Sequence, residues 1–380
     1  MKSLIYIGMD VHKESYFLAT YLVKTSEIIG ETKLEAKPSL VKKYIEEITK
    51  VLQEKGYEEL EFITCYEAGC LGFSLYKELT YLGINCKIVA PTTLTKSLDA
   101  NVKKNDRKDA IMLARNLAFG TCSFVHIPDD IDLETREYIR MRNTHKKALK
   151  KIKQVILAFT LRCGHKYENK TYWTIKHIKW LNDLKLSDSL RLILNEYLDT
   201  YNKFVDKLER LDEKILDISN TSRYKEDTDK LNCLKGITKQ GALTIISEIG
   251  DFKRFATPNE LSSYLGLVPK ERSSAGKGPN LGITKLGNAL VRTQLVESAQ
   301  SIIKGVIGYK SKRLKLKQSG KDIKIISYCD RAIERLMNRY RHLIFSGLHH
   351  NKAIVAIARE LSSFIWGLMN NKLDERIIGG

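Results

Sequence analysis

Four carboxylates in the first third of the chain are spaced like a site that acts on phosphodiesters. Asp10 follows an apolar run at the N-terminus, and Glu67 directly follows the strand-like sequence EFITCY. Asp106 and Asp109 stand three residues apart at the start of a helical segment, so they share one face of that helix. Because ligands gather at the carboxyl ends of strands in open α/β sheets, we expect the four side chains to converge.

Such a set of hard oxygen donors suits Mg²⁺, with Mn²⁺ as the alternative ion. Two such ions about 3.5–4 Å apart would stabilise both the attacking and the leaving oxygen of an in-line phosphodiester displacement. Each of the four acids also has a purely structural interpretation that involves no metal. Asp106 could cap its helix, with Asp109 favoured in the first turn by the helix dipole. Asp10 could be a turn residue and Glu67 a solvated carboxylate, so the metal hypothesis depends on the combination.

Two glycine-containing segments in the last third could contact phosphates. The sequence YLGLVPKERSSAGK (264–277) leads to GITKLGN (282–288) and forms a basic loop that carries Ser273 and Ser274. No histidine stands nearby in the sequence to activate these serines, and a phosphate-contacting loop is the more common role for such a segment. The sequence LKGITKQGA (234–242) predicts two helices joined by a tight turn, whose backbone amides could bind a DNA phosphate. An ordinary helical hairpin explains it equally well.

The elements that must position these residues fall into three regions. Alternating strand and helix signals over residues 1–125 predict an α/β domain with a largely parallel core. Residues 126–225 contain two long periodic segments, 133–161 and 187–218, which favour an antiparallel or intermolecular coiled coil. Residues 226–380 are mainly helical. The expected strands are 3–9, 16–23, 61–66 and 86–90, and the helices 41–55, 71–82, 288–303, 330–343 and 351–370. A capping box at 257–260 (TPNE) starts another helix.

The charge balance points to a polyanionic partner. The 380 residues include 64 Lys and Arg against 45 Asp and Glu, a net charge of +19. Nucleic acid is therefore the first partner to consider. We expect the excess to concentrate on the helical middle and on a segment near the C-terminus that contains Lys310, Lys312, Arg313, Lys315 and Lys317.

Two absences narrow the class of protein. No apolar run approaches the roughly 20 residues of a membrane helix, so we expect no membrane partner. The seven cysteines form no CxxC pair, which favours reduced thiols of a cytoplasmic protein over a disulfide framework or zinc site.

Aromatic and basic residues alternate in the connector between the two long segments (167–180, YENKTYWTIKHIKW). Tyr172, Trp173, His177 and Trp180 could stack on single-stranded bases. Local packing between the long helices is the alternative, and we favour it slightly.

The motifs together resemble a known family. IGMDVHKESYFLA around Asp10, CYEAG around Glu67 and KKNDRKDAIMLAR around Asp106 and Asp109 resemble the DEDD transposases, whose N-terminal domain is similar to RuvC Holliday-junction resolvases. YLGLVP, a serine–small–Gly–Lys element and GITK-G-N resemble the C-terminal domain of the same family. Actin-like sugar kinases also begin with a strand followed by Asp. Their phosphate loop needs glycine and hydroxyl residues, where this chain has VHKE (11–14), so we reject that interpretation.

The resemblance extends from Tyr6 to about Met369 and carries specific expectations. It implies an RNase H-like (RuvC-like) catalytic domain over 1–125, a helical coiled-coil linker over 126–225 and a transposase domain over 226–380. It maps the nucleophile onto Ser274, with Ser273 as its ambiguous neighbour and Ala275 where glycine is common. It further implies a recombinase of an insertion sequence, guided by a structured bridge RNA. In the implied homo-oligomer, a dimer or tetramer, the acidic site of one protomer works with the serine of another.

Two sites in one enzyme have a chemical reason. Hydrolysis at an acidic metal site would discard the phosphodiester energy, whereas a phosphoserine ester keeps it for rejoining to another strand. A structure-specific nuclease of the junction-resolvase type, using the acidic site alone, remains the alternative enzyme. A nucleic-acid-binding scaffold with a degenerate site is the alternative from another class.

Overall fold

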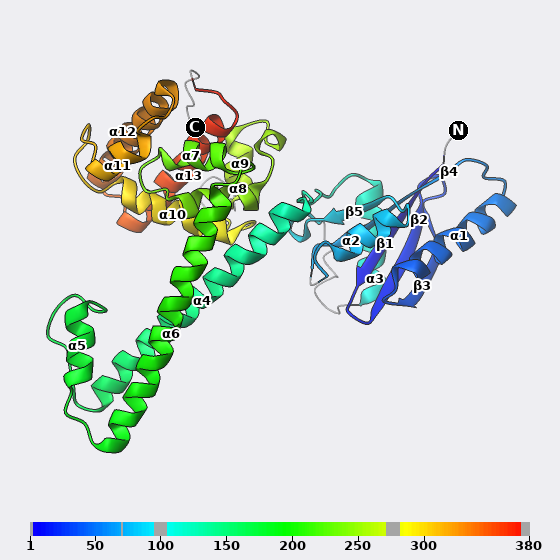
Figure 1. Ribbon diagram of the computed structural model, residues 1–380. Coiled ribbons are helices and arrows are strands. Elements are labelled where there is room, and N and C mark those ends of the chain that lie inside the picture. Colours follow the sequence, from blue (N-terminus) through cyan, green and yellow to red (C-terminus); the bar gives the residue numbers. More distant parts are fainter. Residues whose placement is uncertain (1–2, 70, 95–104, 271–281, 374–380) are drawn as a thin grey trace. The chain divides into compact units, whose positions relative to one another are not determined.

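The computed structural model describes residues 3–69, 71–94, 105–270 and 282–373 (Figure 1). The chain divides into two compact units, Met1–Ile127 and Pro128–Gly380. The six cysteines within the described residues are all free. None of the described helices is both long and apolar enough to cross a membrane.

The first unit is built on a five-stranded sheet with the order β3-β2-β1-β4-β5. Its strands are β1 (Ser3–Val11), β2 (Ser15–Leu22), β3 (Glu27–Glu35), β4 (Leu60–Glu67) and β5 (Cys86–Val89). Its helices are α1 (Pro38–Glu54), α2 (Ser74–Tyr81) and α3 (Asp106–Ala118), with a 3₁₀ turn at Pro91–Thr93. The expected strands and helices of this region are therefore present, and β3 is an additional strand.

The expectation of a largely parallel sheet is wrong, because the sheet is mixed. β1 pairs with β4 and β4 with β5 in parallel, whereas β1 with β2 and β2 with β3 are antiparallel. The cause is the short connections between the first three strands, since a parallel pair needs a crossover of a dozen residues or more. The link between β2 and β3 turns at Ser26, which adopts a left-handed φ of 59°.

The two faces of this sheet carry separate cores. Ile5, Ile7 and Met9 of β1 pack against α1 and α2 on one face. Cys65 of β4 packs with Leu113 of α3 on the other face. Successive side chains of a strand alternate between faces, so the even-numbered positions of β1 point toward α3.

Two long helices open the second unit. α4 (Asp130–Arg162) and α6 (Asp188–Ser219) pack side by side (Figure 1), as the periodicity indicates. They run antiparallel within the chain, because Arg142 pairs with Asp212 while Phe159, further along α4, contacts Tyr197, earlier in α6. The short helix α5 (Ile175–Asp183) lies in the connection between them.

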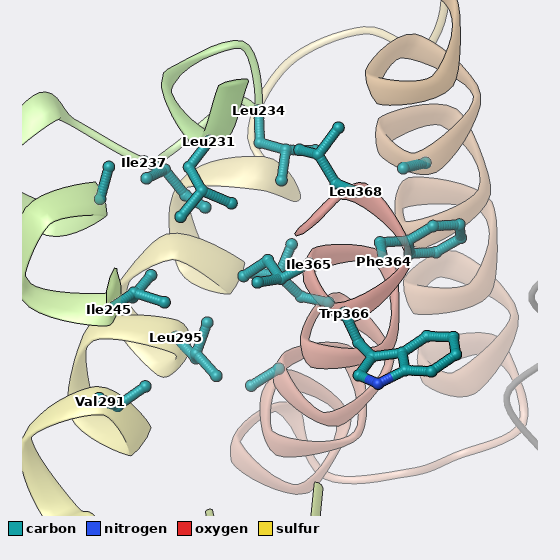
Figure 2. Close-up of a cluster of buried hydrophobic side chains, with 14 of the residues drawn as sticks. Leu231, Leu234, Ile237, Ile245, Val291, Leu295, Phe364, Ile365, Trp366 and Leu368 are labelled. Carbon is teal, nitrogen blue, oxygen red and sulfur yellow. The ribbon is translucent and has the colours of Figure 1, made fainter. Parts of the chain in front are cut away.

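The remaining helices form one apolar core. They are α7 (Lys225–Asn232), α8 (Lys239–Ile249), α9 (Pro258–Tyr264), α10 (Ala289–Ile302), α11 (Lys312–Gln318), α12 (Ile323–Phe345) and α13 (His350–Met369), with a 3₁₀ turn at Phe252–Arg254. The second half of α13 is buried on all sides, as expected for a central helix. Figure 2 shows its residues Phe364 and Ile365 facing the helices around it. The Trp366 ring nitrogen donates to the Phe255 carbonyl at 2.9 Å, which satisfies the polar atom of this buried ring.

We expect Leu295→Ala to lower the free energy of unfolding of the second unit by about 2–5 kcal/mol, because Leu295 is 1% exposed in this core. Leu316→Ala is the control, since Leu316 is 77% exposed and its loss should change stability by less than about 0.5 kcal/mol. Urea unfolding followed by tryptophan fluorescence measures this unit selectively, because Trp173, Trp180 and Trp366 are the only tryptophans in the chain. Equal effects of the two substitutions would contradict this description of the core.

Candidate functional site

Asp10 and Glu67 occupy the carboxyl ends of two neighbouring parallel strands. The register pairs Met9 of β1 with Tyr66 of β4, and the two acids follow directly. Cys65 packs against α3, so Glu67, two residues further along, lies on the same face of the sheet. Asp10 is two residues beyond Gly8, which contacts α3, and therefore shares that face.

Gly8 allows α3 to lie directly on β1. A Cβ at this position would stand 2.1 Å from the Ala110 carbonyl oxygen and 2.4 Å from the Ala114 nitrogen, both of them backbone atoms of α3. The N-terminus of α3 is fixed by Asn105, whose side chain accepts from the Arg107 backbone N–H at 3.0 Å. The helix that carries Asp106 and Asp109 is therefore held against the strand that carries Asp10.

This arrangement brings together Asp10, Asp106 and a residue to which sequence analysis assigned no role, His12. One potential ligand atom from each of the three lies within 4.8 Å of the others. The His12 Nε2 is 3.4 Å from the Asp10 Oδ2 and 3.6 Å from the Asp106 Oδ1. The Asp10 side chain is 17% exposed and that of Asp106 40%. Neither Glu67 nor Asp109 is part of this 4.8 Å group.

Ser274 and its neighbour Ser273 lie outside the described residues, but the two ends of their loop are described. Pro269 and Ile283 form an antiparallel bridge. The Lys270 N–H donates to the Gly282 carbonyl at 2.8 Å, and the Thr284 N–H donates to the Val268 carbonyl at 2.9 Å. The described residues that flank 271–281 therefore pair in a short backbone ladder.

Two glycines close this ladder at its base. Gly266 has a φ of 65°, and a Cβ on it would stand 2.1 Å from the Leu286 carbonyl oxygen. Gly287 has a φ of 77°, and its Cβ would stand 1.8 Å from the Tyr264 carbonyl oxygen. Only glycine fits either position, since both the space and the left-handed backbone exclude a side chain. The YLG and LGN sequences at the two ends of the serine loop are thus packed backbone against backbone.

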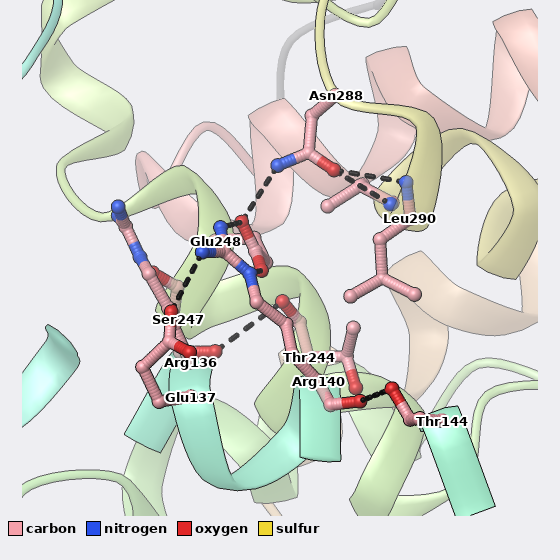
Figure 3. Close-up of polar contacts among 10 residues, drawn as sticks. Arg136, Glu137, Arg140, Thr144, Thr244, Ser247, Glu248, Asn288 and Leu290 are labelled. Carbon is pink, nitrogen blue, oxygen red and sulfur yellow. Dashed lines mark hydrogen bonds and ion pairs between the residues drawn. The ribbon is translucent and has the colours of Figure 1, made fainter. Parts of the chain in front are cut away.

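An ionic network around the buried Glu248 lies directly after this ladder (Figure 3). The Asn288 side chain caps α10 and donates to the Glu248 Oε2 at 2.8 Å. Glu248 is 3% exposed, and it accepts from the Arg140 Nε at 3.0 Å and from the Arg140 Nη2 at 3.1 Å. A buried carboxylate is tolerated when a paired cation and further hydrogen bonds satisfy it. Glu248 therefore ties the end of the serine loop to α4, a supporting role that its sequence context does not reveal.

The tight turn expected in LKGITKQGA joins α7 to α8. Gly236 has a φ of 86°, and a Cβ on it would stand 2.6 Å from the Ser298 carbonyl oxygen. The Lys317 ammonium group donates to the Ile237 carbonyl at 2.5 Å, and burial lowers the pKa of Lys317 to about 8. Lys235 likewise donates to the Ile302 carbonyl at 3.0 Å. Two lysines beside the turn are thus engaged within the protein.

An open groove of about 600 Å³ runs along α12. Glu360 of α13, 5% exposed, contacts the Arg335 Nε at 2.5 Å and the Arg339 Nε at 2.9 Å. The buried Glu360 carboxylate therefore holds the Arg335 and Arg339 side chains in place along this groove. The groove is lined by Arg331, Glu334, Arg335, Asn338, Arg339 and His342.

The aromatic connector packs on itself and against the long helices, where the Trp173 ring lies 5.0 Å from that of Tyr201 in α6, so the favoured alternative is confirmed. His177 is fully buried, and its ring contacts those of Tyr172, Trp173 and Trp180. Of these, Tyr172 is the most accessible, at 40% exposed. Lys153 of α4 lies over the Trp173 ring, 5.2 Å from its centroid.

Comparison with known proteins identifies a transposase family. A family model described as the IS116/IS110/IS902 transposase family matches residues 228–312, which include the tight turn and both ends of the serine loop. The chain is 32% identical to a putative transposase of Sinorhizobium fredii over 96% of its own length and 88% of the relative. It is 30% identical to the transposase for insertion sequence element IS1533 of Leptospira borgpetersenii, over 90% of its own length and 97% of the relative. The chain belongs to the IS116/IS110/IS902 family of transposases. The chain is also 22% identical to the transposase for insertion sequence element IS1111A of Coxiella burnetii, over 86% of each protein.

The contact between Gly8 and α3 can be tested directly by substitution in this transposase. We expect Gly8→Ala to destabilise the first unit by about 1–3 kcal/mol or more, because the new methyl group meets the backbone of α3. Gly69→Ala is the matched control, since its Cβ would meet only the Glu67 carbonyl oxygen at an ordinary 3.7 Å. Hydrogen exchange of the β1 and α3 amides measures the local stability. Unchanged protection in Gly8→Ala would disprove the close docking.

Proposed function

We propose that this chain is the transposase of an insertion sequence and cuts and rejoins DNA strands through an acidic metal site and Ser274. The observation that carries the proposal is the approach of Asp10 and Asp106 at the strand ends of a chain that belongs to a transposase family. Glu67 and Asp109 complete the proposed ligand set. Glu67 shares the sheet face of Asp10, and Asp109 lies in the first turn of α3.

We assign the first unit to the RNase H-like, RuvC-like class. The support is a mixed sheet whose first three strands are antiparallel neighbours and whose last two are added in parallel beside β1. The proposed division is a catalytic domain over 1–125, a coiled-coil linker over 126–225 and a transposase domain over 226–380. The pairing of α4 with α6 supports the middle assignment.

The residues present fit a divalent cation such as Mg²⁺ or Mn²⁺. Carboxylate oxygens are the donors that these ions prefer, and Asp10 is largely shielded from water. When bound, the ion would stabilise the negative charge that develops on the phosphate during displacement. The role of the chain is to hold the acidic side chains at the end of β1 and on the first turn of α3, so that no large rearrangement is needed when the phosphate arrives.

Ser274 would act as the nucleophile. Its Oγ attacks the phosphorus, an Oγ–P bond forms, and one P–O bond of the DNA backbone breaks. The serine proton passes to the departing oxygen, which becomes the hydroxyl end of the cut strand. Attack by a strand-end hydroxyl on the phosphoserine reverses these bond changes and rejoins the DNA without an external energy source.

Nucleic acid is the proposed partner, as DNA substrate and as a structured bridge RNA that guides the enzyme. The support is the net charge of +19 and the arginine-lined groove on α12. We further propose a homo-oligomer, a dimer or tetramer, in which one protomer supplies the acidic site and another the serine. A junction-resolvase-type nuclease remains the second candidate, since the Asp10–Asp106 approach alone is sufficient for metal-dependent hydrolysis.

We expect Asp10→Asn and Asp106→Asn each to lower metal-dependent DNA cleavage by at least about 100-fold, since each removes a charged donor at the reacting phosphate. The assay uses DNA that carries the element's own ends together with RNA transcribed from the element's flanks. Glu61→Gln is the control, because Glu61 is a carboxylate at the opposite end of β4 from Glu67. Full cleavage by both variants would remove the acidic site from the mechanism.

We expect wild-type protein to form a covalent adduct with the same DNA, and Ser274→Ala to form none while binding the DNA with unchanged affinity. Denaturing electrophoresis of labelled DNA measures the adduct, and peptide mapping locates the phosphoserine. Ser273→Ala is the control and should still react. A reactive Ser274→Ala together with an inactive Ser273→Ala would move the nucleophile to Ser273. Cleavage without any adduct would favour the nuclease.

A further inference from the structure

His12 occupies the space between the two acids that the fold brings together. Its Nε2 lies 3.4 Å from the Asp10 Oδ2 and 3.6 Å from the Asp106 Oδ1. Two donors about 2.1 Å from one ion are separated by about 3.0 Å at a right angle and by about 3.4 Å at a tetrahedral angle. The imidazole nitrogen therefore stands at nearly ligand-to-ligand distance from both carboxylates.

The position of His12 follows from the backbone. His12 is two residues beyond Asp10, so an extended chain directs both side chains to the same face. The His12 N–H donates to the Ser15 carbonyl at 2.9 Å, which closes the turn between β1 and β2. The opposite wall of the cluster is Asp106, the first residue of α3, which Gly8 allows to approach. The ring is thus held near the acids by the hairpin, the strand and the helix docking together.

We propose that His12 is a nitrogen ligand of the divalent ion at the acidic site, bound together with Asp10 and Asp106. The proposal rests on the proposed function, because it concerns the same ion. An imidazole donor shifts the preference of an oxygen site from Mg²⁺ toward first-row transition ions such as Mn²⁺ and Co²⁺. His12 would then set which metal this transposase uses, while the carboxylates provide the charge.

If His12 is a counter-ion instead of a ligand, the expected result is different. A protonated ring could serve as the counter-ion of the two carboxylates and be displaced when the ion binds. In that case the nitrogen is absent from the metal's coordination sphere. Coordination and displacement are distinguished by whether the nitrogen nucleus is coupled to a paramagnetic ion.

The experiment loads the full chain with Mn²⁺ and measures nitrogen coupling by pulsed electron paramagnetic resonance. Wild-type protein should show coupling to ¹⁴N, and protein labelled with ¹⁵N only in histidine should show the corresponding ¹⁵N signal, without any substitution. His12→Ala should lose the coupling and weaken Mn²⁺ binding by about tenfold or more, the lower end of what loss of even an outer-shell partner costs. Competition with Mg²⁺ should show a smaller loss for that ion. His165→Ala, a histidine of the second unit, is the control.

Mn²⁺ binding and nitrogen coupling together distinguish failure of His12 as a ligand from failure of the acidic site itself. If Asp10→Asn weakens Mn²⁺ binding while the wild type shows no nitrogen coupling, the acidic site stands and His12 is not a ligand. If neither Asp10→Asn nor Asp106→Asn changes Mn²⁺ binding, the proposed acidic site fails as well. Circular dichroism of His12→Ala checks its fold. His12→Gln, which keeps the length of the side chain without an imidazole, should also lose the coupling.

Discussion

The close approach of α3 to β1 is the contact on which the first unit's site depends. It exists because Gly8 has no side chain, and any Cβ would meet the helix backbone within 2.1 Å. A helix usually packs on a sheet at a distance set by its side chains. Here one strand position allows the backbone itself to make contact. The acids of β1 and α3, distant in the sequence, become neighbours as a consequence.

The second unit uses the same principle at the serine loop. Gly266 and Gly287 bring two backbone segments into contact, and the Arg292 guanidinium donates to the Leu265 and Leu286 carbonyls at 2.9 and 3.2 Å. Carbonyl groups at such a crossing need donors, and Nη1 of Arg292 supplies one to each of these two carbonyls. The ends of the loop are thus fixed by backbone contact and by a cation. Glu248 and Arg140 then connect this base to the long helix α4.

Local patterns predicted the elements well and their contacts poorly. The strands that carry Asp10 and Glu67 and the helix that begins at Asp106 follow from short-range apolar periodicity and capping. β3 was not predicted, because its sequence EIIGETKLE mixes charged and apolar residues and it lies at the sheet edge, where burial imposes little alternation. The parallel core was overestimated, since strand direction depends on connection length and not on strand composition.

The residues that support the candidate sites could not be predicted from the local sequence, for a different reason. Gly8 resembles any glycine in a strand until the helix that packs on it is known, and Glu248 resembles a surface acid until its partners Arg140 and Asn288 are placed. His12 did carry a usable signal. A second metal-binding residue type two positions after Asp10 must share its face if the strand continues. Ser274 follows from motif resemblance alone, and it remains a prediction.

The electrostatics of the acidic cluster link its stability to its chemistry. Two ionised carboxylates at 4.8 Å or less repel by roughly 3 kcal/mol at an effective dielectric constant of about 20. Water screens part of this at Asp106, whose side chain is 40% exposed. Gly8 and the α3 cap hold the two acids close despite that repulsion, with the His12 ring between them. In the proposed site, a divalent ion between the two acids would replace this repulsion with attraction, and its binding would stabilise the fold as well as the reacting phosphate. A phosphate would meet the same negative charge at these acids, so in the proposed mechanism a cation is required there even though the net charge of the chain is +19.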